Sequence, residues 1–142
     1  RRGYEFVTRK ISSHVAQIKL GKIKKLPLGN IDAVRDWGHA KEYVRAMWKM
    51  LNYKKPVDLV ISSGEIHSVR EFVEIAFSYV GLNYKDYVFV DPQYIRPSDK
   101  NVLQGDCFKA EKIINWNYQI SFNDLVEEMV ENDLVSAKNN IK

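Results

Sequence analysis

Cysteine and histidine are scarce in this 142-residue chain, which has one Cys and three His. A single thiol, Cys107, cannot build a disulfide framework or a multi-cysteine zinc site. His14, His39 and His67 are too far apart in sequence to form the i, i+4 pair of a helical zinc motif. We therefore expect no metal ligands, and a chain that suits a reducing compartment such as the cytoplasm.

Long apolar runs and glycine-rich phosphate loops are missing as well. No stretch approaches the roughly 20 apolar residues that cross a bilayer, so we expect no membrane partner. Neither G-x-G-x-x-G nor G-x-x-x-x-G-K occurs, and no G-x-S-x-G elbow supports a serine hydrolase. No run of about five like charges occurs, which argues against a basic nucleic-acid tail. The residues alone therefore mark no catalytic centre.

What the sequence does contain is enough apolar and aromatic material for a core. Hydrophobic residues make up 45% and charged residues 28% of the chain, which has 3 Trp, 8 Tyr and 6 Phe. This composition predicts a folded domain, or a large part of one, rather than a disordered segment. The net charge of +4 favours an anionic partner such as a nucleotide, with a solvated basic surface as the alternative.

Hydrophobic spacing and capping signals predict mainly helices. The first helix carries apolar residues from Val7 to Ile18 on one face, and the second repeats them through Trp48 at the spacing of a buried stripe. Ser68 and Ser121 each precede an acidic residue by three positions, the pattern that caps a helix start. The expected helices are Phe6–Leu20, His39–Leu51, Ser68–Val80, Asp106–Ile114 and the segment that follows Ser121.

Short apolar runs predict strands at Leu26–Asn30, Val57–Ile61 and Tyr87–Val90. Pro27 lacks an N–H donor and restricts the first of them to a sheet edge. Scattered short strands cannot make an independent sheet of ordinary size, so we expect them to belong to a sheet completed elsewhere. The absence of Met before Arg1 supports the same expectation, that the chain is a fragment of a longer protein.

Arginines on loops indicate a binding site. Arg35 lies before a tryptophan, and Arg96 lies in the polar loop 91–104, which is long enough to suggest a functional role. A guanidinium group binds phosphate oxygens in a fork and stacks on rings, so both residues suit a nucleotide. Surface salt bridges of Arg35 with Asp36 and of Arg96 with Asp99 are the alternative.

Distinctive segments extend along nearly the whole chain. The two most specific run from Arg1 to Ile11 and from Gly29 to Ala40, and the second contains Arg-Asp-Trp-Gly-His. The others are Tyr43–Trp48, Ser63–Val73, Tyr94–Pro97 and Leu103–Trp116. Together they resemble the GDP-mannose 4,6-dehydratase family, whose members are extended short-chain dehydrogenases/reductases.

The resemblance implies an α/β fold. The chain would be the C-terminal part of a Rossmann-type extended short-chain dehydrogenase/reductase, mostly the smaller helical substrate-binding domain with short strands. Residues 1–142 would form the GDP-sugar-binding portion, and the NADP-binding Rossmann domain would be absent from the chain. Family members oxidise C4 of GDP-mannose by hydride transfer to NADP. They then eliminate water across C5 and C6 and return the hydride, which gives GDP-4-keto-6-deoxy-mannose.

The resemblance also implies which residues act and which bind. The family's Tyr-x-x-x-Lys pair, Ser/Thr and Glu lie upstream, so the intact protein would be a lyase and this chain alone would be inactive, without catalytic residues. The implied binding residues are Arg2 for NADP and Val7, Lys10, Arg35, Arg96 and Asp99 for the GDP-sugar. Asp99 stands where a glutamate is usual, so a water would bridge it to the ribose. Trp37 and His39 would serve structure, Trp37 packing under Arg35 and His39 starting a helix.

GDP-mannose is therefore the expected substrate and NADP the expected cofactor. A homo-oligomer, either a dimer or a tetramer, is the expected assembly, without nucleic acid as a partner. A related sugar-nucleotide epimerase or reductase would share the Arg-Asp-Trp element but not the run from Arg1 to Ile11. The alternative from another functional class is a stand-alone nucleotide-binding module, which would not be an enzyme.

Overall fold

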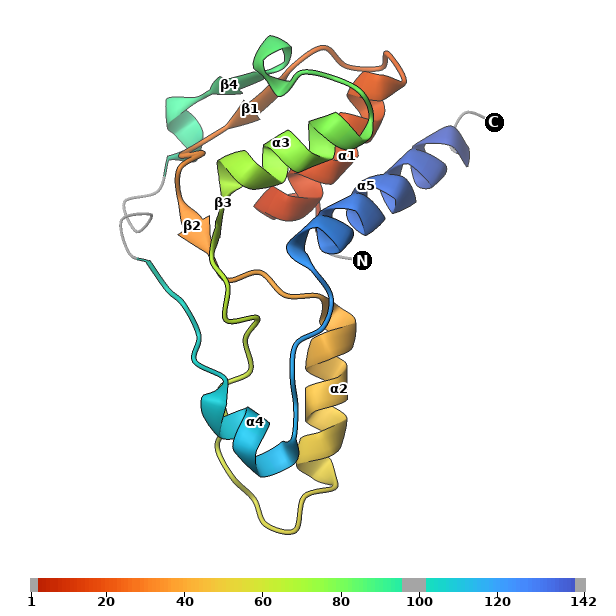
Figure 1. Ribbon diagram of the computed structural model, residues 1–142. Helices are drawn as coiled ribbons and strands as arrows, with labels where there is room; N and C mark the ends of the chain where they lie inside the picture. The colour runs from red at the N-terminus through yellow and green to blue at the C-terminus, as the bar shows by residue number, and fades with distance from the viewer. Residues whose placement is uncertain (1–2, 96–101, 140–142) are drawn as a thin grey trace.

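The computed structural model describes residues 3–95 and 102–139. Its α-helices are α1 (Val7–Lys19), α2 (Ala40–Leu51), α3 (Val69–Tyr79), α4 (Phe108–Ile114) and α5 (Phe122–Asn139) (Figure 1). The strands are β1 (Leu26–Leu28), β2 (Val34–Arg35), β3 (His67–Ser68) and β4 (Val88–Val90), and two 3₁₀ turns, η1 (Tyr84–Asp86) and η2 (Pro92–Tyr94), flank β4. The predicted helices are thus present close to their expected bounds. None of the helices in this part of the chain is long and apolar enough to cross a bilayer.

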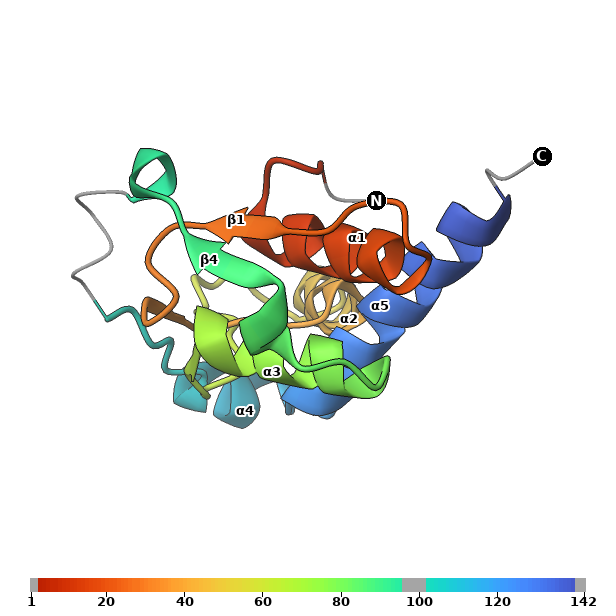
Figure 2. The ribbon, with the colours of Figure 1, turned by 90° about the horizontal axis from the view of Figure 1, so that it is seen from above.

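The main hydrophobic core lies among α1, α3 and α5, with β1 and β4 packed over one side of it (Figure 2). Ile11 and Val15 of α1, Phe72 of α3 and Val126 of α5 are fully buried there. The one-sided apolar face predicted for the first helix is therefore confirmed. Val7, at the start of that face, is 36% exposed because it borders the pocket described below.

One carboxylate is buried between α1 and α5. The Asp133 carboxylate accepts a hydrogen bond from the Ser12 hydroxyl at 2.6 Å and pairs with Arg9 Nη2 at 2.7 Å. The Asp133 side chain is only 4% exposed, so its charge depends on both partners for stabilisation. This pairing fixes the last helix against the first turns of α1.

The strands form two small sheets. β1 and β4 pair in parallel, with Leu26 opposite Val88, and β2 and β3 pair antiparallel, with Val34 opposite Ser68. The first and third predicted strands are confirmed in shorter form. The strand predicted at residues 57–61 is wrong for this chain, because a strand needs a neighbour for its backbone groups and no described segment pairs with it.

α2 buries a different face from the one that its sequence predicts. The predicted stripe points outward, and Trp48 is 64% and Leu51 86% exposed. Glu42 and Ala46 face inward instead, where the carbonyl of Glu42 accepts a hydrogen bond from the Trp116 indole at 3.1 Å. A second, much smaller core results, whose buried hydrophobic residues are Ala46, Ala110, Ile114 and Trp116. Among the described residues nothing covers the outer face of α2. The apolar spacing of the helix therefore predicts a buried face that this part of the chain leaves exposed.

Local signals at the helix ends are confirmed. Ser68 accepts a hydrogen bond from the Glu71 N–H, and the Glu71 carboxylate accepts one from the Ser68 N–H, which completes a capping box. The Ser121 hydroxyl likewise accepts from the Asp124 N–H at 3.1 Å. Gly21 ends the first helical segment with a φ of 70°, a left-handed conformation that glycine adopts without a steric cost.

Candidate functional site

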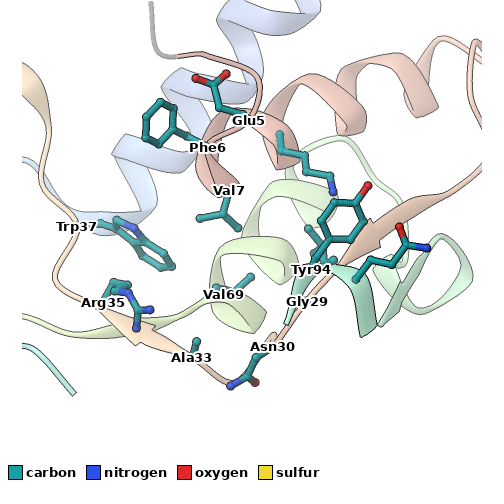
Figure 3. Close-up of a pocket in the computed structure, with 13 residues that line it drawn as sticks. Glu5, Phe6, Val7, Gly29, Asn30, Ala33, Arg35, Trp37, Val69 and Tyr94 are labelled. Carbon is teal, nitrogen blue, oxygen red and sulfur yellow. The ribbon is translucent and has the colours of Figure 1, made fainter. Parts of the chain in front are cut away.

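A pocket of about 310 Å³ opens between the start of α1 and the loops that follow β1 and β4 (Figure 3). Because β1 and β4 are parallel, both loops leave the sheet at the same end, where α/β proteins usually bind ligands. The lining residues are Glu5, Phe6, Val7, Lys10, Leu28, Gly29, Asn30, Ala33, Arg35, Trp37, Val69, Gln93 and Tyr94. Segments that are far apart in the sequence thus converge on one site.

The first turn of α1 supplies Val7 and Lys10, which lie three positions apart and so share a helix face. Lys10 Nζ lies 3.4 Å from the centroid of the Tyr94 ring, a cation–π contact. Burial lowers the pKa of Lys10 from 10.5, and the charge of Asp91 opposes this shift in part. Since Lys10 forms no ion pair with any described residue, its charge remains available to an anionic ligand.

Gly29 allows the loop after β1 to approach η2. A Cβ at position 29 would lie 2.2 Å from the carbonyl oxygen of Tyr94, so any larger residue there would push the two segments apart. The Asp91 N–H donates to the Leu28 carbonyl at 2.7 Å and holds the same segments together. The half-exposed Tyr94 ring is therefore positioned by backbone contacts rather than by packing in the core.

β2 brings Arg35 to the opposite wall, across the pocket from Tyr94 in Figure 3. β2 pairs with β3, where Arg35 lies opposite His67. Arg35 Nη1 also donates to the Val34 carbonyl at 2.7 Å, which turns the guanidinium back along its own strand. The pocket thus has a lysine on one side and an arginine on the other.

His39 starts a helix, as the sequence led us to expect, whereas the packing of Trp37 under Arg35 stays a prediction. Trp37 lines the pocket and packs on two other aromatic rings. The Trp37 indole stacks on Phe122 with 5.7 Å between ring centroids and meets Phe72 edge-on at 5.6 Å. His39 begins α2, where its Nδ1 accepts a hydrogen bond from the Lys41 N–H at 3.1 Å. Aromatic packing therefore anchors the chain two residues beyond Arg35.

Asp36, between Arg35 and Trp37, ties separate loops together. One carboxylate oxygen accepts hydrogen bonds from the Ser63 N–H at 2.9 Å and from the Ser63 hydroxyl at 2.6 Å. The other accepts from the N–H groups of Gly64 and Gly105, both at 3.2 Å. The Arg-Asp-Trp element thus organises the loops beside the pocket as well as contributing to its wall.

The predicted binding residues are only partly described by the structure. Three of them line the same pocket, namely Val7, Lys10 and Arg35. The other three lie outside the described residues, and their roles stay predictions: Arg2, Arg96 and Asp99. We did not predict pocket roles for Gly29 and Tyr94, although both belong to segments that carry the resemblance. The available signal was that Gly29 is near the end of one predicted strand and Tyr94 lies in the loop after another.

The chemistry of the pocket suits binding rather than bond breaking. Lys10 and Arg35 supply two cations against the single carboxylate of Glu5, and Phe6 and Tyr94 supply flat apolar surfaces. Among the described lining residues there is no second carboxylate and no Ser, Cys or His, so neither a carboxylate pair nor a Ser, Cys or His nucleophile lines the pocket. An anion that carries a planar ring matches this arrangement.

Comparison with known proteins agrees with the resemblance seen in the sequence. Residues 1–129 match the family model described as GDP-mannose 4,6 dehydratase. The chain is 50% identical over 138 residues to GDP-mannose 4,6 dehydratase 2 of Arabidopsis thaliana, which covers 97% of this chain and 37% of that relative. It is 47% identical over 157 residues to GDP-mannose 4,6 dehydratase of Homo sapiens, covering 99% of this chain and 42% of the relative. The chain thus spans less than half the length of these relatives.

Solved structures share the fold at lower identity. A structure of RMD from Pseudomonas aeruginosa complexed with NADPH superposes with a TM-score of 0.86 at 17% identity, covering 95% of this chain and 44% of that one. dTDP-glucose 4,6-dehydratase from Bacillus anthracis, in complex with NAD, gives a TM-score of 0.77 at 22% identity, covering 99% and 42%. The fold is that of the C-terminal part of a Rossmann-type extended short-chain dehydrogenase/reductase, which confirms the expected class.

Proposed function

Because the chain belongs to the GDP-mannose 4,6-dehydratase family, we propose that its pocket binds the GDP moiety of GDP-mannose. The observation that carries this proposal is the convergence of Lys10 and Arg35 on one pocket with aromatic walls. GDP offers a diphosphate to the two cations and a planar purine to the aromatic surfaces. A purely apolar or a purely acidic pocket would not have supported this ligand.

Each proposed contact follows from the chemistry of its side chain. Lys10 and Arg35 donate charge-assisted hydrogen bonds to phosphate oxygens, each worth roughly 1.5–3 kcal/mol. Val7 supplies an apolar contact beside them. Arg96 adds a second guanidinium at the diphosphate, and Asp99 reaches the ribose through a bridging water.

In the intact protein, this portion would present GDP-mannose for conversion to GDP-4-keto-6-deoxy-mannose, a lyase reaction that uses NADP. Contacts to the remote nucleotide would orient the hexose for that reaction. The residues of this chain do not fit the cofactor by themselves, because the sequence has no glycine-rich phosphate loop. Arg2 stays the proposed NADP contact. The amino-terminal part that the longer relatives contain would hold NADP, and no reaction step is assigned to this chain.

The chain alone is therefore proposed to bind substrate without converting it. It contains no Tyr-x-x-x-Lys pair that could transfer the hydride and the proton. We place the intact protein in the cytoplasm as a dimer or tetramer. The net charge of +4 on the 142 residues of this chain then attracts an anionic nucleotide rather than a nucleic acid.

Calorimetric titration of the chain with GDP tests the binding proposal. We expect saturable binding to one site that Arg35→Ala and Lys10→Met weaken. Titration with UDP serves as the control for base preference, because it keeps the diphosphate and changes the planar ring. If the folded chain does not bind GDP, the proposal that the pocket holds the GDP moiety is wrong.

The activity is tested separately on the intact protein with NADP and GDP-mannose. Proton NMR would show the new C6 methyl signal of the deoxy sugar, with UDP-glucose and dTDP-glucose as negative controls. A protein that binds NADP and GDP-mannose but yields no methyl signal would instead be a sugar-nucleotide epimerase or reductase.

A further inference from the structure

His67 lies next to the pocket wall that carries Arg35. In the antiparallel pair of β2 and β3, Arg35 and His67 are opposite residues. Side chains of opposite residues stand on the same face of such a pair, with their Cβ atoms about 4.5–5.5 Å apart. Arg35 lines the pocket, whereas His67 is not among the lining residues. His67 is therefore a neighbour of the proposed phosphate-binding arginine rather than a part of the pocket surface.

Aromatic packing fixes the plane of the His67 imidazole. The ring stacks on Phe122 with 3.8 Å between ring centroids and an interplanar angle of 1°. Trp37, two residues beyond Arg35, stacks on the same phenyl ring with 5.7 Å between centroids. The imidazole and the segment that bears Arg35 thus share one aromatic support at the start of α5.

Each ring nitrogen of His67 faces a carboxylate of its own. Nε2 lies 3.5 Å from a Glu65 oxygen and Nδ1 lies 3.7 Å from a Glu71 oxygen, and both contacts are ion pairs only when the imidazole is protonated. Nε2 is buried and has no hydrogen-bond partner among the described residues. The charged groups of the described chain around this ring come from the loop before β3 (Glu65), from α3 (Glu71) and from β2 (Arg35). α5 contributes the uncharged ring of Phe122.

The protonation state of His67 decides how this cluster acts on Arg35. Histidine is the side chain that ordinarily changes its charge between about pH 5 and 8. The backbone N–H of Ser68 donates to Glu71 and holds the pKa of that carboxyl below its usual value, so Glu71 stays ionised across this range. A protonated imidazole pairs with both carboxylates. A neutral imidazole leaves them uncompensated beside Arg35, where they compete with an anionic ligand for the guanidinium.

We infer that His67 is a positioning residue of the nucleotide site, whose protonated form holds Glu65 and Glu71 so that they do not compete with the diphosphate for Arg35. His67 therefore makes nucleotide binding stronger at pH 6 than at pH 8, and a bound nucleotide in turn favours the protonated imidazole. This inference rests on the proposed function, because it concerns how the same pocket holds its ligand. A ring that served packing alone would act on the nucleotide equally whether or not it carried a proton.

Two substitutions separate the charge of His67 from its packing. His67→Phe keeps a flat ring on Phe122 that cannot be protonated. His67→Arg places a planar group there that also stacks on rings and carries its charge at both pH values. Calorimetric titration of the intact protein with GDP, at pH 6 and at pH 8, measures the Kd of each variant. A terminal phosphate itself titrates near about pH 6, so the variants are compared with the wild type at the same pH.

At pH 6 we expect the wild type to bind GDP roughly 5-fold more tightly than His67→Phe, which is the lower end of the usual coupling between two sites. At pH 8 these two proteins should bind alike, and His67→Arg should bind roughly 5-fold more tightly than either. Equal affinities of the wild type and His67→Phe at pH 6, in proteins with the same thermal midpoint, would overturn the inference.

His39→Asn is the matched control for these titrations. His39 also faces a carboxylate, that of Glu128 at 3.3 Å, and an asparagine can still cap the start of α2. Because His39 is not opposite Arg35, this variant should follow the wild type at both pH values. A loss at pH 6 as large as that of His67→Phe would show that any histidine charge has the same effect, and would contradict the role of His67.

The dependence on Arg35 is tested by repeating the comparison in an Arg35→Ala protein. There the advantage of His67 over phenylalanine at pH 6 should fall below about 2-fold, because the side chain through which it acts is missing. An undiminished advantage would mean that the imidazolium attracts the ligand directly, which would overturn its role as a positioning residue.

The same titrations keep the two proposals apart. If the wild type binds GDP but loses nothing in His67→Phe at pH 6, the inference about His67 is wrong and the GDP site stands. If the wild type binds no GDP at either pH, the proposed function is wrong and the inference about His67 falls with it.

Discussion

Lys10 places its ammonium nitrogen 3.4 Å from the centre of the Tyr94 ring. The lysine belongs to the first turn of α1 and the tyrosine ends η2, so the contact joins these two elements on the side of the pocket opposite Arg35. The aromatic ring limits the positions that the long lysine side chain can adopt without neutralising its charge. The cation is therefore held ready for an anionic ligand before the ligand arrives.

Removing the Lys10 charge is expected to weaken GDP binding. Lys10→Met keeps the length of the side chain and removes the charge-assisted hydrogen bond, so the Kd should rise roughly 10- to 100-fold. Lys41→Met, which removes a lysine charge from an exposed position outside the pocket, is the matched control and should leave the Kd unchanged. Calorimetric titration measures both, and an equal effect of the two variants would show that only overall charge matters.

GDP binding is expected to weaken in alkaline solution before an ordinary lysine would lose its proton. Burial lowers the pKa of Lys10 from 10.5, and only the protonated form attracts phosphate, so affinity falls as pH rises through the lowered pKa. The folded state also binds fewer protons here than the unfolded chain, so this group makes stability rise with pH across the same window. Lys10→Arg keeps its charge throughout and should lose less affinity than the wild type between neutral and alkaline pH. Identical pH profiles for the wild type and Lys10→Arg would show that the alkaline loss of affinity does not come from Lys10.

Gly29→Ala is expected to damage the pocket without a large loss of fold stability. The added methyl group would meet the Tyr94 carbonyl at 2.2 Å, so η2 must move and carry the aromatic ring away from Lys10. We expect about a 10-fold weaker GDP affinity, roughly 1.4 kcal/mol, because the displaced ring no longer holds Lys10 in place. Gly64→Ala, at a φ of 80° with open space around it, should cost stability and leave affinity unchanged.

Asp36→Ala is expected to destabilise the loops beside the pocket. The substitution leaves the donors of Ser63, Gly64 and Gly105 without their acceptor, at a cost of about 3 kcal/mol. Asp36→Asn retains one acceptor oxygen and should lose less. Urea unfolding measures the free energy of each variant, and equal losses would mean that the network contributes through packing alone.

Asp133→Ala is expected to be among the most destabilising single changes, at about 3–5 kcal/mol, because it leaves Arg9 with an unpaired charge between two helices. A double variant, Arg9→Met with Asp133→Leu, removes both charges and should recover much of that loss. Thermal and urea unfolding measure the stability of Asp133→Ala and of the double variant. A double variant less stable than Asp133→Ala would contradict the explanation from the buried charge.

The sequence predicted features that depend on neighbours a few positions away. The capping box of Ser68 and Glu71, the left-handed Gly21 and the buried face of α1 all follow from local spacing, and all are present. The strand at 57–61 and the burial of Trp48 failed because each needs a partner surface that the described residues do not provide. Periodicity shows that a face is apolar but not which polypeptide segment covers it.

Only those site residues that belong to segments resembling the family could be predicted from the sequence. Val7, Lys10 and Arg35 were named from matching segments, and the structure places all three on one pocket. The close approach of Gly29 to Tyr94 was not predictable, because it depends on the parallel pairing of β1 with β4, which no local pattern specifies.

The same parallel pairing has a kinetic consequence. β1 and β4 lie on either side of α2 and α3 in the sequence, so joining them requires closure of a long loop, which is slow compared with forming a helix. During synthesis the amino-terminal wall of the pocket leaves the ribosome well before the segment that bears Tyr94. The growing chain should therefore acquire the proposed nucleotide site late, and retention of GDP would show that β1 and β4 have paired.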